Sequence, residues 1–212
     1  MSFLELAKKR CSCRNFNDQQ VPEETLQYIL EAGRVAPTGV NKQPQHILVI
    51  RSKEGLAKME QVTKFYNAQT VLIICTEPDA AWTRQGDDFN IADIDATIVT
   101  SHMILAATEK DVASLWICRF WPEIARKEFH IPDNYRPVNI LALGYTDDTT
   151  PKNCGSRCRK QLHTKPSNVI LILFFPIKKS RSGSRLRTTP AFLFDMLNNS
   201  NGYIQQHPDD DN

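Results

Sequence analysis

Hydrophobic residues after position 21 recur at the spacing of an amphipathic helix. Leu26, Ile29 and Leu30 stand three and four positions apart, so they fall on one face of a helix. The preceding residues 21–24, VPEE, combine a proline and two acidic side chains, which suit a first helical turn. We therefore expect a helix that begins beside this segment and ends near Gly33.

Four later segments have the length and composition of strands. Residues 46–50, 71–75, 113–117 and 138–143 are short apolar runs, and we predict that the first two are buried. Between Ile91 and Lys110, apolar residues cover most of the helical circumference, which is typical of a central, buried helix. A short helix is expected between Pro122 and the Ile131-Pro132 pair. The predicted order is helix, helix, strand, helix, strand, helix, strand, helix, strand, which fits a sheet packed between helices.

Composition places the chain among ordinary globular domains. Its 212 residues are 41% hydrophobic and 24% charged. The balance of 26 basic and 24 acidic side chains excludes the strongly basic composition of a dedicated nucleic-acid-binding protein. The apolar run at residues 169–177 is broken by Pro176 and is far shorter than the roughly 20 residues of a membrane-spanning helix. Glu5 and the basic residues 8–10 leave no signal-peptide pattern, so we expect a cytoplasmic protein with reduced cysteines.

The charge changes abruptly near residue 150. Residues 1–150 carry a net charge of −4, whereas residues 151–212 carry +6 and are rich in Ser, Asn, Pro and Arg. We expect a main domain at residues 1–160 and an atypical C-terminal extension at residues 161–212. Three interpretations of the extension stay open: a native addition whose residues 169–175 add a strand to a partner's sheet, a disordered tail, or out-of-frame residues that replaced the native end.

Four segments carry candidate chemistry. In an extended backbone Arg10, Ser12 and Arg14 would point to one side, where two guanidinium groups and a hydroxyl suit an anionic ligand. The others are the Gly39-containing loop at residues 36–44, the apolar strand end at residues 114–120 and the basic cluster at residues 157–160. Each also has an ordinary structural interpretation. In the order given, these are a solvated helix end, a helix-to-strand connection, core packing and a basic tail.

Other classes of site lack their sequence signatures. Cys154, Cys158 and His163 do not have the spacing of a zinc knuckle, so no metal site is expected. No Gly-x-Gly-x-x-Gly follows a predicted strand and no Walker loop is present, which argues against a Rossmann or P-loop nucleotide site.

Taken together and in this order, the segments resemble the nitroreductase family of FMN-dependent enzymes, especially its shorter members. The resemblance covers roughly residues 1–160 and rests on FLELAKKRCSCRNF at 3–16, VPEETL at 21–26, ILEAG at 29–33, APTGVNKQP at 36–44 and later strings such as WIC at 116–118, IP at 131–132 and LALGY at 141–145. It implies an α+β fold: a central, mainly antiparallel sheet flanked by helices, formed as an intertwined homodimer with FMN at the subunit interface.

The resemblance also implies which residues bind FMN. Arg10, Ser12 and Arg14 of one chain would hold the phosphate, ribityl chain and pyrimidine edge, while Pro37, Thr38, Gly39 and Asn41 would reach the same flavin from the partner chain. Trp116, Ile117, Cys118 and Arg119 would line the ring, with the Cys118 backbone N–H near N5. Gln61 and Lys64 would lie near the pyrimidine carbonyls, and Arg157 and Arg159, with Lys160, would close on the phosphate.

The implied activity is hydride transfer from NADH or NADPH through FMN N5 to nitroaromatic, quinone or similar electron-poor acceptors in a ping-pong reaction, without a protein acid or base. An FMN-binding storage or sensor protein is an alternative, and the basic tail suggests a less favoured role with nucleic acid.

Two residues depart from the family pattern. Asp111 replaces a helix-capping glycine, which predicts a strained turn, and Arg119 replaces a small residue beside the ring.

Overall fold

The computed structural model describes residues 1–147, 161–163 and 173–175. The chain divides into two units, Met1–Arg159 and Lys160–Asn212. The elements of the first unit are α1 (Phe3–Lys9), α2 (Glu23–Arg34), the 3₁₀ turn η1 (Gly39–Asn41), β1 (Gln45–Ile50), α3 (Lys53–Val62), β2 (Thr70–Thr76), the 3₁₀ turn η2 (Pro78–Ala80), α4 (Ala92–Glu109), β3 (Ala113–Ile117), α5 (Pro122–Phe129) and β4 (Arg136–Gly144). The predicted alternation of helices and strands is therefore confirmed.

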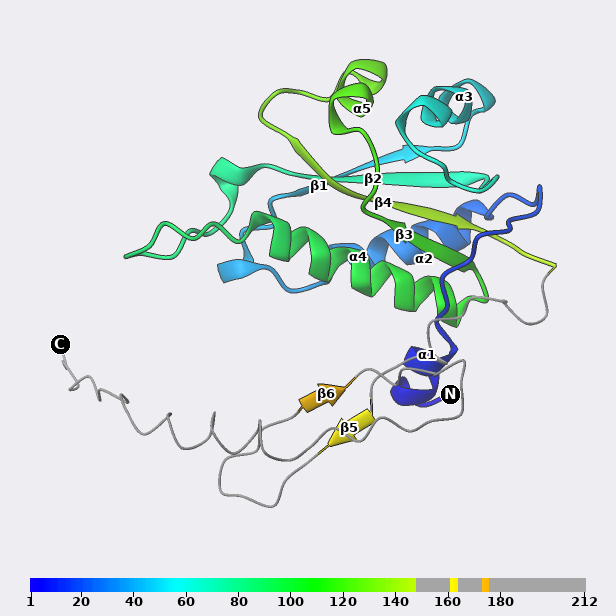
Figure 1. Ribbon diagram of the computed structural model, residues 1–212, viewed down its shortest axis with the longest axis horizontal. Coiled ribbons are helices and arrows are strands. Elements are labelled where there is room, and N and C mark those ends of the chain that lie inside the picture. The colour runs from blue at the N-terminus through cyan, green and yellow to red at the C-terminus, as the bar shows by residue number, and fades with distance from the viewer. Residues whose placement is uncertain (148–160, 164–172, 176–212) are drawn as a thin grey trace, which may run out of the picture. The chain divides into compact units, whose positions relative to one another are not determined.

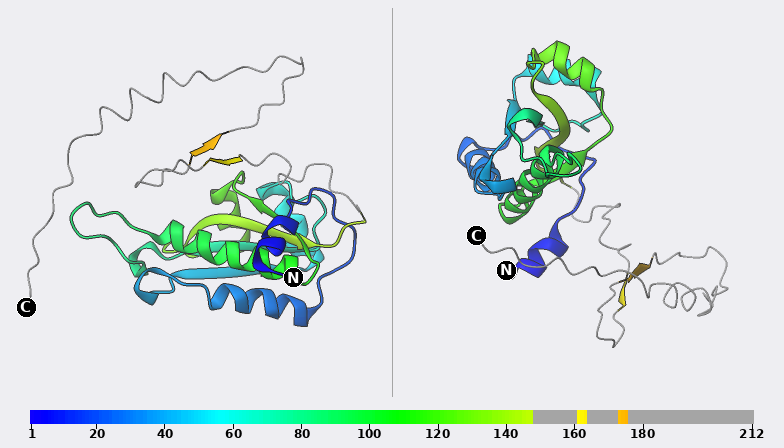
Figure 2. Two further views of the ribbon diagram at one scale, coloured as in Figure 1. Left: turned by 90° about the horizontal axis from the view of Figure 1, so that it is seen from below. Right: turned by 90° about the vertical axis from the view of Figure 1, so that its left-hand side faces the viewer.

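The four strands form one antiparallel sheet in the order β1-β2-β4-β3. Helices α2 and α4 cover one face of this sheet, and α3 and α5 cover the other, so the sheet is the middle layer (Figures 1 and 2). The α+β prediction of an antiparallel sheet flanked by helices is confirmed. Among the described residues, no helix has both the length and the hydrophobicity needed to cross a bilayer.

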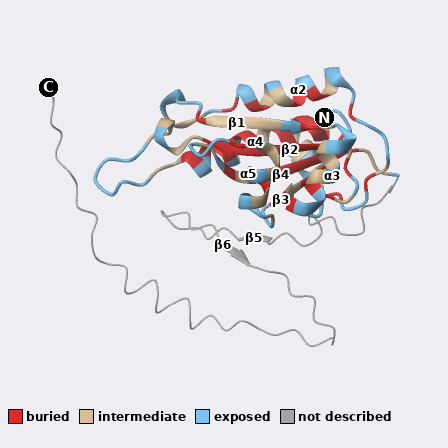
Figure 3. Cartoon of the chain, turned by 90° about the horizontal axis from the view of Figure 1, so that it is seen from above, coloured by how far each residue is buried: buried red, intermediate tan, exposed pale blue. Residues whose placement is uncertain are grey.

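Alternate residues of the central strands pack into two separate cores. In β2, Val71, Ile73 and Cys75 join the core under α3 and α5, whereas Leu72 and Ile74 join the core under α2 and α4. This alternation follows from the two-residue period of a strand, and it explains why β2 is an unbroken apolar run. Figure 3 shows the buried residues gathered in this central layer.

Two predictions of burial have different outcomes. Helix α4 has ten buried residues around its circumference, which confirms the prediction of a central, buried helix. The predicted burial of the first strand is wrong, because only Ile50 of β1 is buried and Val49 is exposed. The reason is the position of β1 at the edge of the sheet, where it pairs with β2 alone.

The turn from α4 to β3 confirms the prediction made for Asp111. This residue has φ +57°, in the left-handed region that favours glycine. The N–H of Val112 donates to the carbonyl of Ala107 at 2.8 Å, and the N–H of Asp111 donates to that of Thr108 at 3.3 Å, which is a Schellman cap. The Asp111 carboxylate also pairs with Lys9, which ties α1 to this turn.

In the second unit the structure describes only β5 (Gln161–His163) and β6 (Leu173–Phe175), which pair in antiparallel register. Strand β6 coincides with the end of the apolar run at residues 169–175. The interpretations of the C-terminal extension otherwise concern residues outside the described ranges.

Candidate active site

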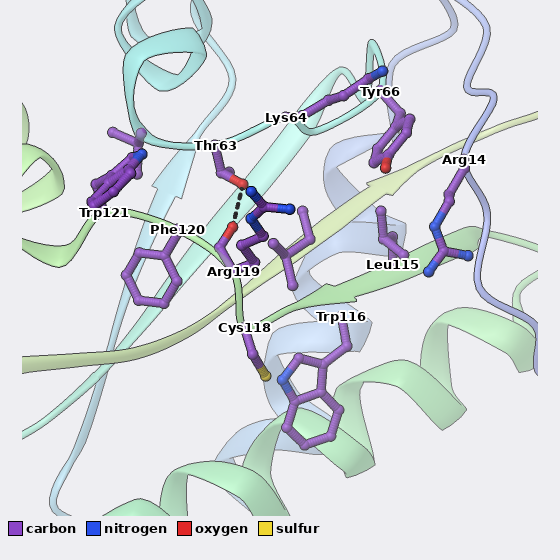
Figure 4. A pocket seen from close by; sticks show the side chains of 12 residues that line it. Arg14, Thr63, Lys64, Tyr66, Leu115, Trp116, Cys118, Arg119, Phe120 and Trp121 are labelled. Atoms are coloured by element: carbon purple, nitrogen blue, oxygen red, sulfur yellow. Dashed lines mark hydrogen bonds between the residues drawn. The ribbon is translucent and has the colours of Figure 1, made fainter.

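A cavity of about 800 Å³ opens beside the end of β3. Its walls come from the end of β3 and the residues after it, from the end of α3, and from the extended N-terminal segment (Figure 4). The lining residues are Arg14, Val62, Thr63, Lys64, Tyr66, Leu115, Trp116, Ile117, Cys118, Arg119, Phe120 and Trp121. The structure therefore brings together six of the predicted site residues: Arg14, Lys64, Trp116, Ile117, Cys118 and Arg119.

Pairing at the sheet edge positions Arg14. Ser12 forms a parallel bridge with Ser114, and the N–H of Cys13 donates to the carbonyl of Ser114 at 2.9 Å. The N-terminal segment thus runs alongside β3 and continues the sheet beyond its edge. Buried Cys13 and Phe16 anchor the segment in the core, and Arg14 lies between them with an exposed side chain at the cavity.

Two hydrogen bonds hold the segment after β3 against the end of α3. The Thr63 hydroxyl donates to the carbonyl of Arg119 at 2.9 Å (Figure 4). The N–H of Trp121 donates to the carbonyl of Val62 at 3.0 Å. The segment after β3 is therefore fastened to the end of α3 on both sides of Phe120. This contact sets the width of the cavity between the two elements.

The lining has a positive electrostatic character. Arg14, Lys64 and Arg119 are cationic, and none of the described residues that line the cavity is acidic. The Lys64 ammonium lies 4.9 Å from the centre of the Tyr66 ring. Such a cavity favours a ligand that carries negative charge.

The aromatic part of the lining combines a polar group with apolar surface. Trp116 is half-buried, and its indole N–H has no hydrogen-bond partner among the described residues. In Figure 4 its ring lies beside the Cys118 side chain, which is exposed. A buried N–H without a partner is costly, so this donor is a natural contact for an acceptor atom of a bound ligand.

The remaining predicted residues do not line this cavity. Arg10 caps the C-terminal end of α1, Ser12 is engaged at the edge of β3, and Gln61 is exposed on α3. Pro37, Thr38, Gly39 and Asn41 lie in and before η1, between α2 and β1. Arg157, Arg159 and Lys160 lie outside the described residues.

Hydrogen bonds hold the η1 loop in an unusual backbone conformation. Val40, Asn41 and Gln43 all have positive φ angles. The N–H of Gln43 donates to the Thr38 hydroxyl at 3.0 Å, and the Gln43 side chain donates to that of Asn41 at 2.9 Å. Strain of this kind is found at ligand-binding loops, so the loop is a candidate for a second part of the site.

Sequence reasoning missed Val62, Thr63, Tyr66 and Trp121 in the lining, as well as the role of Asp95, whose Oδ1 accepts a hydrogen bond from the Gly39 N–H. Asp95 has a signal in the sequence, because it stands among the apolar positions 94, 96 and 98 of the predicted buried helix. Val62, Thr63 and Tyr66 have none, since they reach the end of β3 only through tertiary packing, whereas Trp121 directly follows the predicted strand-end segment at residues 114–120.

Comparison with protein families matches residues 7–64 and 60–145 to the nitroreductase family. The chain belongs to this family. A nitroreductase family protein of Clostridium difficile 630 has a similar structure, with 47% sequence identity, a TM-score of 0.69 and coverage of 72% of this chain and 88% of its own. The resemblance inferred from the sequence is confirmed, and with it the assignment to a family of oxidoreductases.

Three further relatives carry names that state an activity. An FMN-dependent nitroreductase of Clostridium difficile R20291 has 25% identity and a TM-score of 0.62, covering 73% of this chain and 94% of its own. A protein of Archaeoglobus fulgidus, provisionally named an NADH dehydrogenase/NAD(P)H nitroreductase, is 29% identical over 68% of this chain and 86% of its own. An iodotyrosine deiodinase of Thermotoga neapolitana is 25% identical over 71% of this chain and 91% of its own. The names of the first two proteins include the predicted cofactors, FMN and NAD(P)H.

Proposed function

We propose that this nitroreductase-family chain is an FMN-dependent oxidoreductase that passes electrons from NADH or NADPH to electron-poor acceptors in a ping-pong reaction. The observation that carries the proposal is the cavity beside β3, which joins three cationic side chains, an apolar strand end and no acidic residue among those described. When bound, FMN supplies the site with a group that takes a hydride from NAD(P)H and returns two electrons to an acceptor.

The residues present fit FMN. A cavity of about 800 Å³ is within the usual range for a cofactor of this size. Arg14 and Lys64 are suited to the negatively charged parts of FMN, and the β3 wall of Leu115 and Ile117 offers an apolar surface to a flat ring. The unpaired indole N–H of Trp116, which lies on the opposite face of β3 from Leu115 and Ile117, supplies a further donor at the end of the strand.

The protein's own contribution is binding and electrostatics. Cations in the lining stabilise negative charge as electrons arrive, because their side chains lie at the cavity that the ligand occupies. The overall reaction with a quinone uses NAD(P)H and one proton and gives NAD(P)⁺ and the hydroquinone. Reduction of a nitro group to a nitroso group uses the same reagents and releases water. Solvent supplies the proton, so the site needs no protein acid.

A homodimer would complete the site. The strained η1 loop lies outside the cavity of its own chain, and Phe3 and Leu4 of α1 expose large apolar side chains. Exposed apolar side chains on one short helix are typical of a surface that packs against a partner. We infer that two copies associate and that each η1 loop, with Pro37, Thr38, Gly39 and Asn41, serves the partner's cavity.

The first test is the absorption spectrum of the full chain after loading with FMN. We expect flavin bands that bleach with anaerobic NADH or NADPH and return when a quinone or nitroaromatic is added. Bound flavin that bleaches but never reoxidises with acceptors would favour a storage or sensor protein. A chain that does not take up FMN would overturn the proposal.

Arg14→Gln provides the residue-level test. This change should weaken FMN binding by about tenfold, as expected for loss of a hydrogen bond to a charged group. Arg34→Gln is the matched control, because it removes the same charge from an exposed position on α2 where Arg34 pairs with Glu31. Equal FMN affinity in the two variants would contradict the assignment of Arg14.

Mixed dimers test the shared site. A heterodimer of an Arg14→Gln chain with an Asn41→Ala chain has one doubly altered site and one site in which both contributions are native. Mixing the two weak-binding variants should therefore restore tight FMN binding to one of the two sites of each heterodimer. No recovery in a verified heterodimer would show that each chain builds its site alone.

A further inference from the structure

Arg119 has an anchored backbone, and its side chain has no partner among the described residues. Its backbone is held by the hydroxyl of Thr63, and the neighbouring Trp121 N–H binds the carbonyl of Val62. The Arg119 side chain is exposed at the cavity and forms no ion pair or hydrogen bond with any residue in the described part of the chain. Its guanidinium group is therefore available to a ligand in the cavity.

Arg119 lies in a different part of the lining from Arg14, one of the two cations suited to the cofactor. Arg14 reaches the cavity from the N-terminal segment beside β3, whereas Arg119 follows the end of the strand and lies with the residues from the end of α3 (Figure 4). The two guanidinium groups thus belong to different parts of the lining. The Arg119 guanidinium can therefore meet an anionic group other than the one at Arg14.

Aromatic side chains accompany this second cation. Phe120 and Trp121 follow Arg119 directly, and Trp121 is 67% exposed even though indole is largely apolar. Exposed aromatic surface at the edge of a cavity is typical of a binding surface. A guanidinium group beside a phenyl and an indole ring suits a ligand that is both aromatic and negatively charged.

We propose that Arg119 makes the enzyme selective for electron-poor aromatic acceptors that carry a carboxylate. This inference rests on the proposed function, because the acceptor is the second substrate of the same cavity. The carboxylate accepts hydrogen bonds from Arg119 and is unchanged by the reaction. The nitro group takes two electrons and two protons, loses one oxygen as water and becomes a nitroso group.

The test compares 4-nitrobenzoate with its neutral methyl ester. For each enzyme we measure the ratio of kcat/KM for the acid to kcat/KM for the ester, so that the intrinsic difference in reactivity cancels between variants. Arg119→Gln should lower this ratio by about tenfold, as expected for loss of a charge-assisted hydrogen bond. Arg119→Lys should retain part of the preference because it keeps the charge.

Two controls separate substrate recognition from other roles. Arg34→Gln, which removes the same charge on α2, should leave the ratio within about twofold of the native value. NAD(P)H is also anionic, so the bleaching rate with NAD(P)H and the reoxidation rate with each acceptor are measured separately. The inference requires that Arg119→Gln slow reoxidation by 4-nitrobenzoate more than reoxidation by the ester.

Two results would overturn the inference. One is an Arg119→Gln variant whose ratio is unchanged, which includes equal losses for the acid and the ester, and the other is an effect confined to bleaching by NAD(P)H. If FMN does not bind or bleach, the proposed function fails instead. Titration with benzoate and benzamide, followed by tryptophan fluorescence, then tests Arg119 without turnover, and equal binding of both by the native chain would overturn its role.

Discussion

The backbone N–H of Gly39 donates a hydrogen bond to Oδ1 of Asp95 across 2.9 Å, and this contact joins the η1 loop to the first turn of α4. Asp95 is only 1% exposed, and its Oδ2 has no hydrogen-bond partner among the described residues. The positive end of the α4 dipole favours a carboxylate at this position. A single buried acid therefore anchors the strained loop that we assign to the partner's site.

Removal of the Asp95 carboxylate should destabilise the protein. Asp95→Ala leaves the Gly39 N–H without its acceptor, and we expect the free energy of unfolding to fall by about 1–3 kcal/mol in urea titrations. Asp93→Ala is the control on the same helical turn, because Asp93 is exposed and pairs with Arg136 at 2.8 Å. Its effect should stay below about 1 kcal/mol. Equal losses in the two variants would contradict the anchoring role of Asp95.

The close approach of Ile91 favours a glycine at position 39. A Cβ atom on Gly39 would lie 2.2 Å from Cδ1 of Ile91 and 3.2 Å from Cβ of Trp82. Gly39→Ala should lower the free energy of unfolding by about 1–3 kcal/mol, since one of the neighbours must shift. Ile91→Val removes the nearest atom, so the double variant should recover most of the loss. A double-mutant cycle with no coupling would contradict this packing.

The left-handed backbone at Asp111 should make the stability of the protein sensitive to substitution there. Asp111→Gly should raise the free energy of unfolding by up to about 1 kcal/mol, because glycine adopts this φ without the Cβ penalty. The change also removes the exposed ion pair with Lys9, which limits the gain. Asp111→Ala should be the least stable of the three proteins, since it keeps the Cβ and loses the ion pair. An alanine variant as stable as the glycine variant would contradict the conformational explanation.

The order of helices and strands along the chain could be predicted from the sequence, whereas the position of each strand within the sheet could not. The apolar run at 47–50 resembles that of a central strand, yet β1 lies at the edge because β2 is the only described strand that pairs with it. Which strands pair depends on tertiary packing, and the hydrophobic pattern of a single strand does not reveal its partners.

The same limit applies to the site. Arg14, Lys64 and the residues at the end of β3 stand in segments with recognisable patterns, and the structure brings them to one cavity. Thr63 and Trp121 escaped notice because their role arises from hydrogen bonds between the end of α3 and the segment after β3. The sequence of either segment does not reveal that it contacts the other.

Cys118 and Cys75 should differ sharply in their reactivity towards iodoacetamide. Burial in β2 raises the pKa of the Cys75 thiol to about 11, although the nearby Arg126 opposes the shift. At pH 8 only ~0.1% of such a thiol is ionised, and the surrounding core also excludes the reagent. Cys118 is exposed at the cavity, so peptide mass spectrometry should find it labelled in the native protein well before Cys75. In concentrated urea the two should react at similar rates, because unfolding removes the burial. Labelling of Cys75 at the rate of Cys118 in the native protein would contradict the buried position of β2.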